Sequence, residues 1–509
     1  MFRAQTSIVS SRLVKRPQIR RWLLSALGCG QQFSLRAKVL FALVIFITSF
    51  SIKSLHATDL APITHTEHQL YTGMAGQYLA QSVSMLKGHG ILFPDNQDPE
   101  DTSLLARPPG YPMFLGAVYY FFGGSYFTAQ LVQNLLNSIS PVLIFLIAGA
   151  LVSQRVGAVS AMIAAVSHHL SYYSNAILPD ALCALPILLG VCILVRTKHR
   201  RQVLGYALAG AMMGLSVWLR PNALLMGCFF AALLLVISRN RRRTVRRVWI
   251  TALTPLIVVA PITIRNYLVY GEFVPVSINM GIVLWEGIAD GGGERFGALP
   301  TDDLVSEQEA ALYGNPAYGK DWSSPDGIER DRARVKNSLA VIARHPFWFA
   351  GVMIGRMADM LKYSAEATLV FRSSDTRLIE LGKSVEGQKN PNRTPKEKDI
   401  ESDRSRAAIG EWFAWMRPAA RLLQRATKET AQLFIAFGAL IMFGLSWRRS
   451  LFILTVPLYY LLIQSIAHTE FRYTLPMHYF LFIFAGTTWV LIGYATWRGI
   501  RRLLRRDDY

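Results

Sequence analysis

The chain has 509 residues, of which 52% are hydrophobic and only 17% are charged. Soluble domains carry roughly 25% charged residues, so a soluble enzyme, a disulfide-rich secreted domain and a disordered protein are excluded. The formal net charge of +21 is concentrated in short runs between apolar segments. Such runs indicate membrane topology, and we expect no nucleic-acid partner. The four cysteines show no paired spacing for a disulfide or a zinc site.

A basic tail, residues 1–37, precedes the first apolar run. This run begins near residue 39, too far in for a typical cleaved signal peptide, and no small-residue cleavage site follows it. We therefore expect an uncleaved anchor. By the positive-inside rule the tail lies in the cytoplasm. The same rule places there the basic runs at 196–201, 239–247, 447–450 and 498–506.

Apolar runs of about 17–25 residues recur along the chain, which is the length of a membrane-crossing helix. Ten such helices would leave all of these basic runs on the cytoplasmic side. They lie at roughly 38–55, 126–151, 156–174, 178–195, 203–219, 222–238, 249–264, 430–447, 451–467 and 474–497. The apolar segments 109–124 and 346–361 are shorter, and we expect amphipathic helices in the interface, anchored by Tyr119, Tyr120 or Trp348. The predicted fold class is an all-α polytopic membrane protein.

These helices divide the chain into five regions. They are a basic cytoplasmic tail (1–37), an N-terminal transmembrane module (38–264) with an outward loop at 56–125, an outward-facing region (265–429), C-terminal transmembrane helices (430–497) and a second basic tail (498–509). The stretch near 383–405 is charged and poor in aromatic residues, which is typical of disorder. No internal repeat is found, and this disfavours a transporter built from repeated halves.

Asp180 follows Pro179 at the predicted start of the fourth helix. One interpretation is helix capping, because an acid in a first turn interacts with free N–H groups and with the helix dipole. The other is a carboxylate that faces an outward cavity, as a base or as a ligand of a divalent metal ion. The sequence leaves both open.

Three arginines stand at the outer ends of predicted helices. Arg220 lies between the fifth and sixth helices, Arg265 ends the seventh, and Arg472 lies in the last outer loop beside Glu470 and Tyr473. Each arginine could reach lipid headgroups from the interface, and Glu470 with Arg472 could form a local ion pair. An arginine can equally grip a phosphate through two parallel hydrogen bonds. Together they indicate an anionic, lipid-linked ligand.

Further motifs complete an ordered series. The series is Gly76-Gln-Tyr78-Leu-Ala80, Leu86-Lys-Gly-His-Gly90, Arg107-Pro-Pro-Gly-Tyr-Pro112, Asp180, Trp218-Leu-Arg-Pro221, Ile264-Arg-Asn-Tyr267 with Gly271-Glu-Phe-Val-Pro275, His345-Pro346, and Glu470-Phe-Arg-Tyr473 with Pro476. In this order the motifs resemble the GT-C membrane glycosyltransferases of family 39. That family includes protein O-mannosyltransferases and the aminoarabinose transferases of lipid A. The resemblance covers most of the chain, from about residue 38 to 497.

The resemblance implies a transferase that uses a polyprenyl-phosphate-linked sugar as donor and a lipid, glycan or protein as acceptor. It implies an active site at the outer membrane–water boundary. The length and the orientation of the chain suggest a bacterial inner membrane, in which this site would face the periplasm. If the resemblance holds, Arg220 and Arg472 bind the donor phosphate, and Arg265 supports them. The cofactor that it allows is a divalent metal ion near Asp180. Substrate-binding residues would be Tyr78, Arg107, Tyr111, Glu470 and Tyr473.

The family places one catalytic acid in the first outward loop and a second in the next. Asp180 matches the second acid, but the first position falls on Met74 when Tyr78 is aligned. Glu67 is the expected replacement, with Asp59 as a more distant candidate. Without such an acid, the chain would bind lipid-linked sugars without transferring them. A lipid-linked sugar flippase or transporter is the other alternative, although its charges would lie at the midplane of the membrane.

Overall fold

The computed structural model describes residues 17–60, 72–90, 101–123, 125–197, 202–238, 241–363, 370 and 407–504. Within these residues the chain is helical and contains no strand. The α-helices are α1 (Pro17–Ala26), α2 (Leu35–Asp59), α4 (Thr72–Leu86), α5 (Gly110–Phe122), α6 (Tyr126–Asn137), α7 (Ile139–Leu151), α8 (Gln154–Val166), α9 (His168–Tyr173), α10 (Ala184–Arg196), α11 (Gln202–Leu219), α12 (Met226–Ile237), α13 (Arg241–Tyr270), α14 (Met280–Ile288), α15 (Asp302–Tyr313), α16 (Gly327–Arg344), α17 (Pro346–Met360), α20 (Arg417–Ser465) and α21 (Leu475–Leu504). Short helical turns include η3 (Pro221–Ala223), η4 (Ala289–Gly293), η7 (Ala414–Met416) and η8 (Phe471–Thr474).

The predicted class, an all-α polytopic membrane protein, is confirmed. Among the described residues six helical stretches are long and apolar enough to cross a membrane, or seven if α16 and α17, which meet at 105°, form one bent span. Three shorter apolar helices add to them: 154–166, 184–196 and 221–237. The predicted number of ten crossings is therefore not confirmed.

Helix α20 explains part of this difference. It has 49 residues, and a straight helix of that length would measure about 74 Å, more than twice the hydrocarbon core of a bilayer. Its backbone departs from helical geometry at Ser446, with φ −162° and ψ 93°. Two helical segments therefore meet at Ser446, next to the turn that the basic run at 447–450 predicts.

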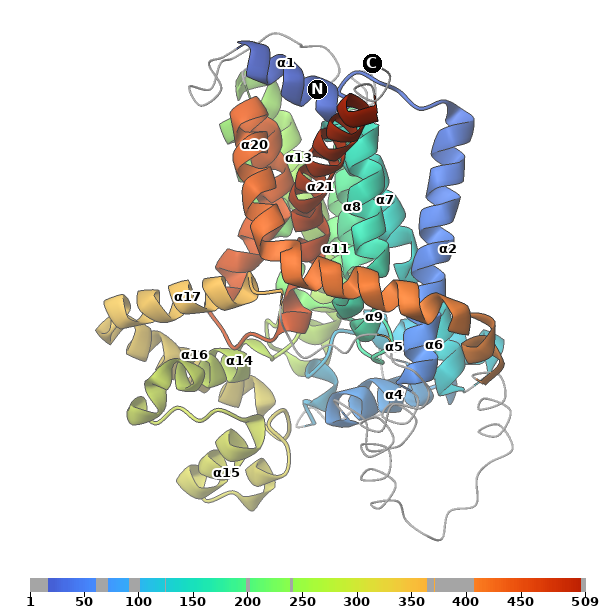
Figure 1. The fold of residues 1–509 in the computed structure, drawn as a ribbon. Coiled ribbons are helices and arrows are strands. Elements are labelled where there is room, and N and C mark those ends of the chain that lie inside the picture. The colour runs from blue at the N-terminus through green and yellow to red at the C-terminus, as the bar shows by residue number, and fades with distance from the viewer. Residues whose placement is uncertain are drawn as a thin grey trace.

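The long helices pack side by side into a bundle (Figure 1). Helix α1 and the final turns of α21 lie at one end, and α4, α14, α15 and α16 lie at the other. Helix α17 and the first part of α20 run across the bundle axis near this second end. Helices α5 and α17 are the two elements that the short apolar segments predict.

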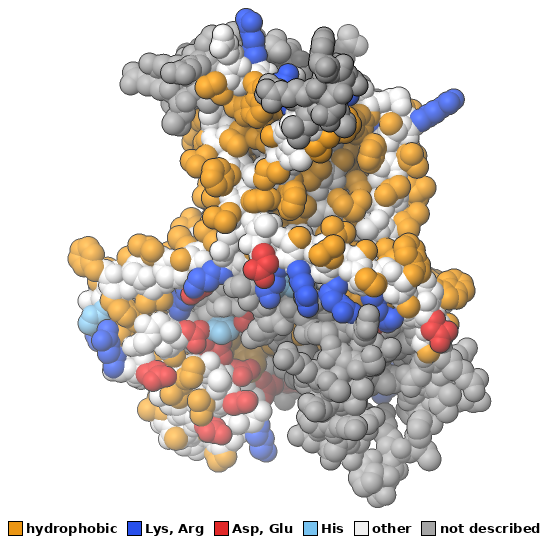
Figure 2. Space-filling view, in the orientation of Figure 1, with side chains coloured by type: hydrophobic (Ala, Val, Ile, Leu, Met, Phe, Trp, Pro, Cys, Tyr) orange, Lys and Arg blue, Asp and Glu red, His pale blue; other side chains and the backbone are white. Residues whose placement is uncertain are grey.

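The surface follows the same division (Figure 2). Apolar side chains cover the body of the bundle, and a row of Lys and Arg marks its boundary on the side of α17 and the first part of α20. Acidic side chains gather beyond this row, on the lobe formed by α14 to α16. We call this lobe, residues 274–349, the outer lobe. Its own core includes Ile282, Trp285 and Trp322.

A separate apolar cluster attaches α4 and α5 to the end of the bundle. Tyr78, Tyr111 and Leu115 pack there against Leu178 and Leu182. This cluster holds the segment between α9 and α10, which carries Asp180, at the boundary between the apolar bundle and the outer lobe.

Candidate functional site

The segment that carries Asp180 is irregular. Helix α9 ends at Tyr173, and α10 begins only at Ala184, with Cys183 as its N-cap. Asp180 therefore lies before the helix, and the capping interpretation is wrong. Its side chain is 2% exposed and forms an ion pair with Arg220.

Arg220 reaches Asp180 because α11 stops one residue earlier. Its backbone is extended, with φ −153° and ψ 126°, and Pro221 begins the next helical turn, η3. Proline has no N–H to donate to the preceding turn, so it ends α11 at this point. Ser216 Oγ of α11 donates a hydrogen bond of 2.9 Å to the Cys183 carbonyl, which fixes α11 against the Asp180 segment.

The start of α5 supports the same region from the other side. Gly110 lies so close to α11 that a Cβ atom there would be 2.5 Å from the Trp218 carbonyl oxygen. The next residue, Tyr111, donates a 2.7 Å hydrogen bond to Gln133. Gln133 in turn donates to the carbonyls of Ser174 and Ala176 at 2.8 Å each. Tyr111 is fully buried, so the described contacts make it a support of the irregular segment.

The last outer loop brings its own charged group to Arg220. Arg472 donates hydrogen bonds to Glu470 and, at 3.2 Å, to the Tyr473 hydroxyl, which itself donates to Glu470. The guanidinium carbon of Arg220 lies 4.0 Å from the centre of the Tyr473 ring, and that of Arg472 lies 5.1 Å from it. Two arginines therefore flank one aromatic ring, an arrangement that cation–π attraction favours.

Five predicted residues thus form one site: Asp180, Arg220, Glu470, Arg472 and Tyr473. Burial lowers the pKa of Arg220, while Tyr473 and Glu470 favour its charged form. Burial also opposes ionisation of Glu470, but the nearby His468 imidazole and the hydrogen bond from Arg472 outweigh it and lower its pKa to about 2. Both carboxylates are therefore paired with arginines, Asp180 in a buried setting and Glu470 in a half-exposed one.

Tyr78 and Arg107 lie at the edge of this site. The Tyr78 ring packs edge-on against Tyr111 at 5.1 Å, and Tyr78 is close enough to Arg220 to favour its charge. The guanidinium carbon of Arg107 is 5.9 Å from the centre of the Tyr78 ring, and its Nε donates 2.9 Å to Gln77. The structure thereby joins α4 and the start of α5 to the arginines.

Met74 lies in the same place. Its sulfur accepts a 3.7 Å contact from Nη2 of Arg472. The sequence position at which the family resemblance expects an acid therefore does face the site, but it presents a thioether. Glu67, the expected replacement, lies outside the described residues.

Two other predicted residues are not joined to the site by any described contact. Arg265 is 1% exposed, and its Nε and Nη1 have no hydrogen-bond partner among the described residues. Asp59 forms an ion pair of 2.6 Å with Arg417 of α20.

The sequence reading missed a histidine beside the site. His468 Nδ1 lies 2.5 Å from Asp290 Oδ2, and its Nε2 lies 3.9 Å from Glu470 Oε1. Burial disfavours the charged imidazole, but the hydrogen bond to Asp290 and the nearby carboxylate of Glu470 outweigh it and raise its pKa to about 10. His468 stands two residues before Glu470, and Asp290 precedes the triple glycine 291–293. A charged residue beside three glycines was the available signal.

The outer lobe and α17 both approach this loop closely. Arg356 of α17 donates to the carbonyls of Ser465, at 3.0 Å, and Gly287. A Cβ atom on Gly287 would lie 2.5 Å from the backbone nitrogen of His468. The position of Glu470 and Arg472 is therefore fixed from α14 and α17 as well as from the bundle.

The described residues do not fit a metal centre. No group of three or more His, Cys, Asp or Glu side chains among them is arranged to hold a metal ion. Asp180, the expected ligand, is paired with Arg220.

Residues 106–264 match the family model described as dolichyl-phosphate-mannose-protein mannosyltransferase. This segment contains Arg107, Tyr111, Asp180 and Arg220, and it ends one residue before Arg265. The match confirms the resemblance to the GT-C membrane glycosyltransferases that the motifs predict. No match was found among curated proteins.

Solved structures of low similarity include two membrane glycosyltransferases. The archaeal oligosaccharyltransferase AglB from Archaeoglobus fulgidus, in complex with an inhibitory peptide and a dolichol-phosphate, is 11% identical, with 97% of this chain and 52% of that chain covered and a TM-score of 0.41. ArnT from Cupriavidus metallidurans, bound to undecaprenyl phosphate, is 14% identical, with 89% of this chain and 77% of that chain covered and a TM-score of 0.34. The chain spans about half the length of the oligosaccharyltransferase chains, 48% and 52%.

Proposed function

We propose that this integral membrane protein is a glycosyltransferase that moves a sugar from a polyprenyl-phosphate-linked donor to an acceptor. The observation that carries the proposal is the group of Asp180, Arg220, Arg472 and Glu470 around Tyr473. Part of this group lies in the segment that matches the mannosyltransferase family. We further propose that the site faces the periplasm of a bacterial inner membrane.

The donor supplies the driving force, since a lipid phosphate is a competent leaving group. The bond between the anomeric carbon and the phosphate oxygen breaks, and the phosphate departs with the electron pair. Arg220 and Arg472 neutralise the negative charge that develops there. Arg265, buried near the outer end of α13, supports them if the donor reaches it.

The ion pair between Asp180 and Arg220 links donor binding to catalysis. While it is paired, the carboxylate is a weak base, because the guanidinium stabilises its charge. A donor phosphate competes for the Arg220 donors and loosens the pair. Asp180 then accepts the proton of the acceptor hydroxyl or phosphate, whose oxygen forms the new bond to the sugar. Glu67 is the second proposed acid.

A second candidate function is binding without transfer. It is favoured by the thioether of Met74 beside Arg472, at the position where the family resemblance expects an acid. The two candidates share the donor site and differ only in turnover.

The deciding experiment incubates purified protein with a panel of polyprenyl-phosphate sugars and crude envelope acceptors. Free polyprenyl phosphate is measured by mass spectrometry. Asp180→Asn and Arg472→Ala should lower release by about 10²–10⁴-fold, the range for losing a general base or a charge-stabilising donor. Glu67→Gln should do the same if Glu67 is the second acid.

Matched controls are Asp303→Asn and Arg332→Ala, which alter exposed residues of the outer lobe. Both should retain wild-type release. Donor binding without release from any sugar would replace the transferase by the binding function. Full activity of Asp180→Asn would remove Asp180 from the mechanism.

A further inference from the structure

The first part of α20 is an amphipathic helix with three distinct faces. Ala420, Gln424, Thr427 and Ala431 are buried against the bundle. A second face carries basic residues with spacings of four, four and three, which places them along one side of a helix. These residues are Arg417, Arg421, Arg425 and Lys428.

The third face is apolar and exposed. Trp412 and Trp415, which precede the helix, are 77% and 75% exposed, and Leu422 and Leu433 continue the face. Tryptophan prefers the boundary between lipid and water. This part of α20 lies across the bundle at the boundary that the basic row marks (Figures 1 and 2).

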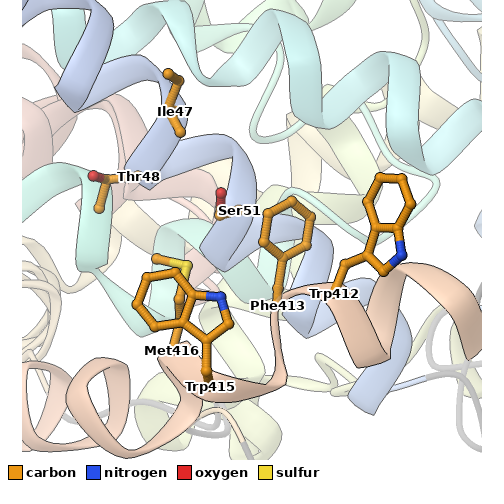
Figure 3. A pocket seen from close by; sticks show the side chains of 7 residues that line it. All are labelled: Ile47, Thr48, Ser51, Trp412, Phe413, Trp415 and Met416. Carbon is orange, nitrogen blue, oxygen red and sulfur yellow. The ribbon is translucent and has the colours of Figure 1, made fainter.

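A groove of about 510 Å³ opens at the start of this helix. Figure 3 shows Trp412, Phe413, Trp415 and Met416 on one side and α2 on the other. From α2 it receives Ile47, Thr48 and Ser51. The lining is mostly apolar, and the groove lies beside the lipid-facing surface of α2, where Leu43, Val44 and Ile47 are exposed.

The basic face of α20 begins directly after the groove, at Arg417. Arg417 is held by Asp59, and Arg421 donates 3.0 Å to the Val370 carbonyl through Nε. Arg425 is exposed. Arg421 and Arg425 lie roughly 8 and 14 Å along the helix axis from Met416. The acids on the same stretch are Glu411 and Glu429, both exposed.

We infer that this surface binds one anionic phospholipid of the surrounding membrane, with an acyl chain in the groove and its phosphate at Arg421 and Arg425. Charge complementarity selects the headgroup, because each arginine near an anionic surface contributes about fivefold to binding. The apolar lining selects a chain and excludes a free phosphate. This surface is separate from the site around Tyr473, and the inference goes beyond the proposed function.

Fluorescence quenching tests the inference on the full chain in phosphatidylcholine vesicles. A minor fraction of either phosphatidylglycerol or phosphatidylcholine carries brominated acyl chains. The contribution of Trp415 is the difference between the wild type and Trp415→Phe. We expect brominated phosphatidylglycerol to quench Trp415 several-fold more than brominated phosphatidylcholine at the same mole fraction.

The double variant Arg421→Gln, Arg425→Gln should lose this excess, while Arg332→Gln, on the outer lobe, should retain it. Circular dichroism and thermal unfolding of each variant verify that it is folded. Equal quenching by the two lipids would overturn the inference, because the groove would then be an ordinary lipid-facing surface. Displacement of the brominated lipid by equimolar polyprenyl phosphate would overturn it too, since the groove would then belong to the donor.

Discussion

At the scale of single residues, the site depends on charges that compensate one another. Arg220 is paired with Asp180, Arg472 with Glu470, and His468 with Asp290. Removing Arg220 leaves the buried Asp180 carboxylate uncompensated, and removing Glu470 does the same to the buried Arg472, which costs more than such a pair contributes. Conservative substitutions that retain hydrogen bonding, such as Asp→Asn, are therefore the more informative ones here.

Glu286 provides a test of this environment by pH. Burial, helped by Asp302, Asp290 and Glu470 and opposed by His468, raises its pKa from 4.5 to about 7. The folded protein thus binds this proton more tightly than the unfolded chain. The free energy of unfolding of the outer lobe should therefore fall as the pH rises from 4.5 to about 7.

Hydrogen exchange of α14 amides, corrected for intrinsic rates, measures this dependence. Glu286→Gln should reduce it, and the exposed control Glu307→Gln should leave it unchanged. Burial also raises the pKa of Asp331 to about 7. This residue contributes to the pH dependence in the same direction, so part of the dependence should remain in Glu286→Gln. An unaltered pH dependence in Glu286→Gln would contradict the prediction.

Some of these residues could be found from the sequence, and others could not. Polar residues at the outer ends of apolar runs are costly in a membrane, so Asp180, Arg220 and Arg472 stood out without a structure. The irregular backbone around Asp180 could not be predicted, because the neighbouring Ile177 and Leu178 are apolar and suggest a helix. Gln133, far away in the sequence, holds the irregular backbone by binding its carbonyls.

At the scale of elements, the tight contact between α14 and the last outer loop is decisive. Gly287→Ala would place a methyl group against the His468 backbone. We expect it to cost about 1–3 kcal/mol of stability and to reduce turnover on the order of 10²-fold by displacing Arg472. Thermal unfolding and the release assay measure the two effects.

The matched control is Gly355→Ala in α17, because no atom lies within 4 Å of a Cβ there. It should leave turnover unchanged and stability equal or higher, since alanine favours helices more than glycine. Wild-type turnover in Gly287→Ala would show that the loop tolerates the displacement.

Element boundaries were the weaker part of the sequence reading. The first part of α20 was not predicted as an element, although its basic residues repeat at helical spacing. Its exposed apolar face and its buried face lie on different sides, so the sequence shows no single apolar stripe. The break at Ser446 was easier to predict, because Arg448 and Arg449 mark a loop outside the membrane.

At the scale of the whole molecule, α1 and the end of α21 lie at one end and the outer lobe lies at the other (Figure 1). From the positive-inside rule we expect the first end to lie in the cytoplasm. In a variant whose four cysteines are replaced by alanine, Leu312→Cys should react with a membrane-impermeant maleimide on intact cells. Gln18→Cys, in α1 of the basic tail, should react only after the cells are permeabilised.

Both side chains are exposed outside the candidate spans, so labelling of each after permeabilisation is the internal control. The opposite pattern would invert the orientation and place the site around Tyr473 in the cytoplasm.

The pairing of Asp180 with Arg220 also bears on the order of synthesis. Both residues leave the ribosome long before Arg472, which is 252 positions after Arg220. A nascent chain that has inserted only as far as α12 already contains both partners of this pair, so these two charges can compensate each other before the last outer loop is made. Arg472, which completes the group, is added with the last outer loop. The site can therefore assemble only when the N-terminal and C-terminal membrane segments have both been inserted in the correct orientation.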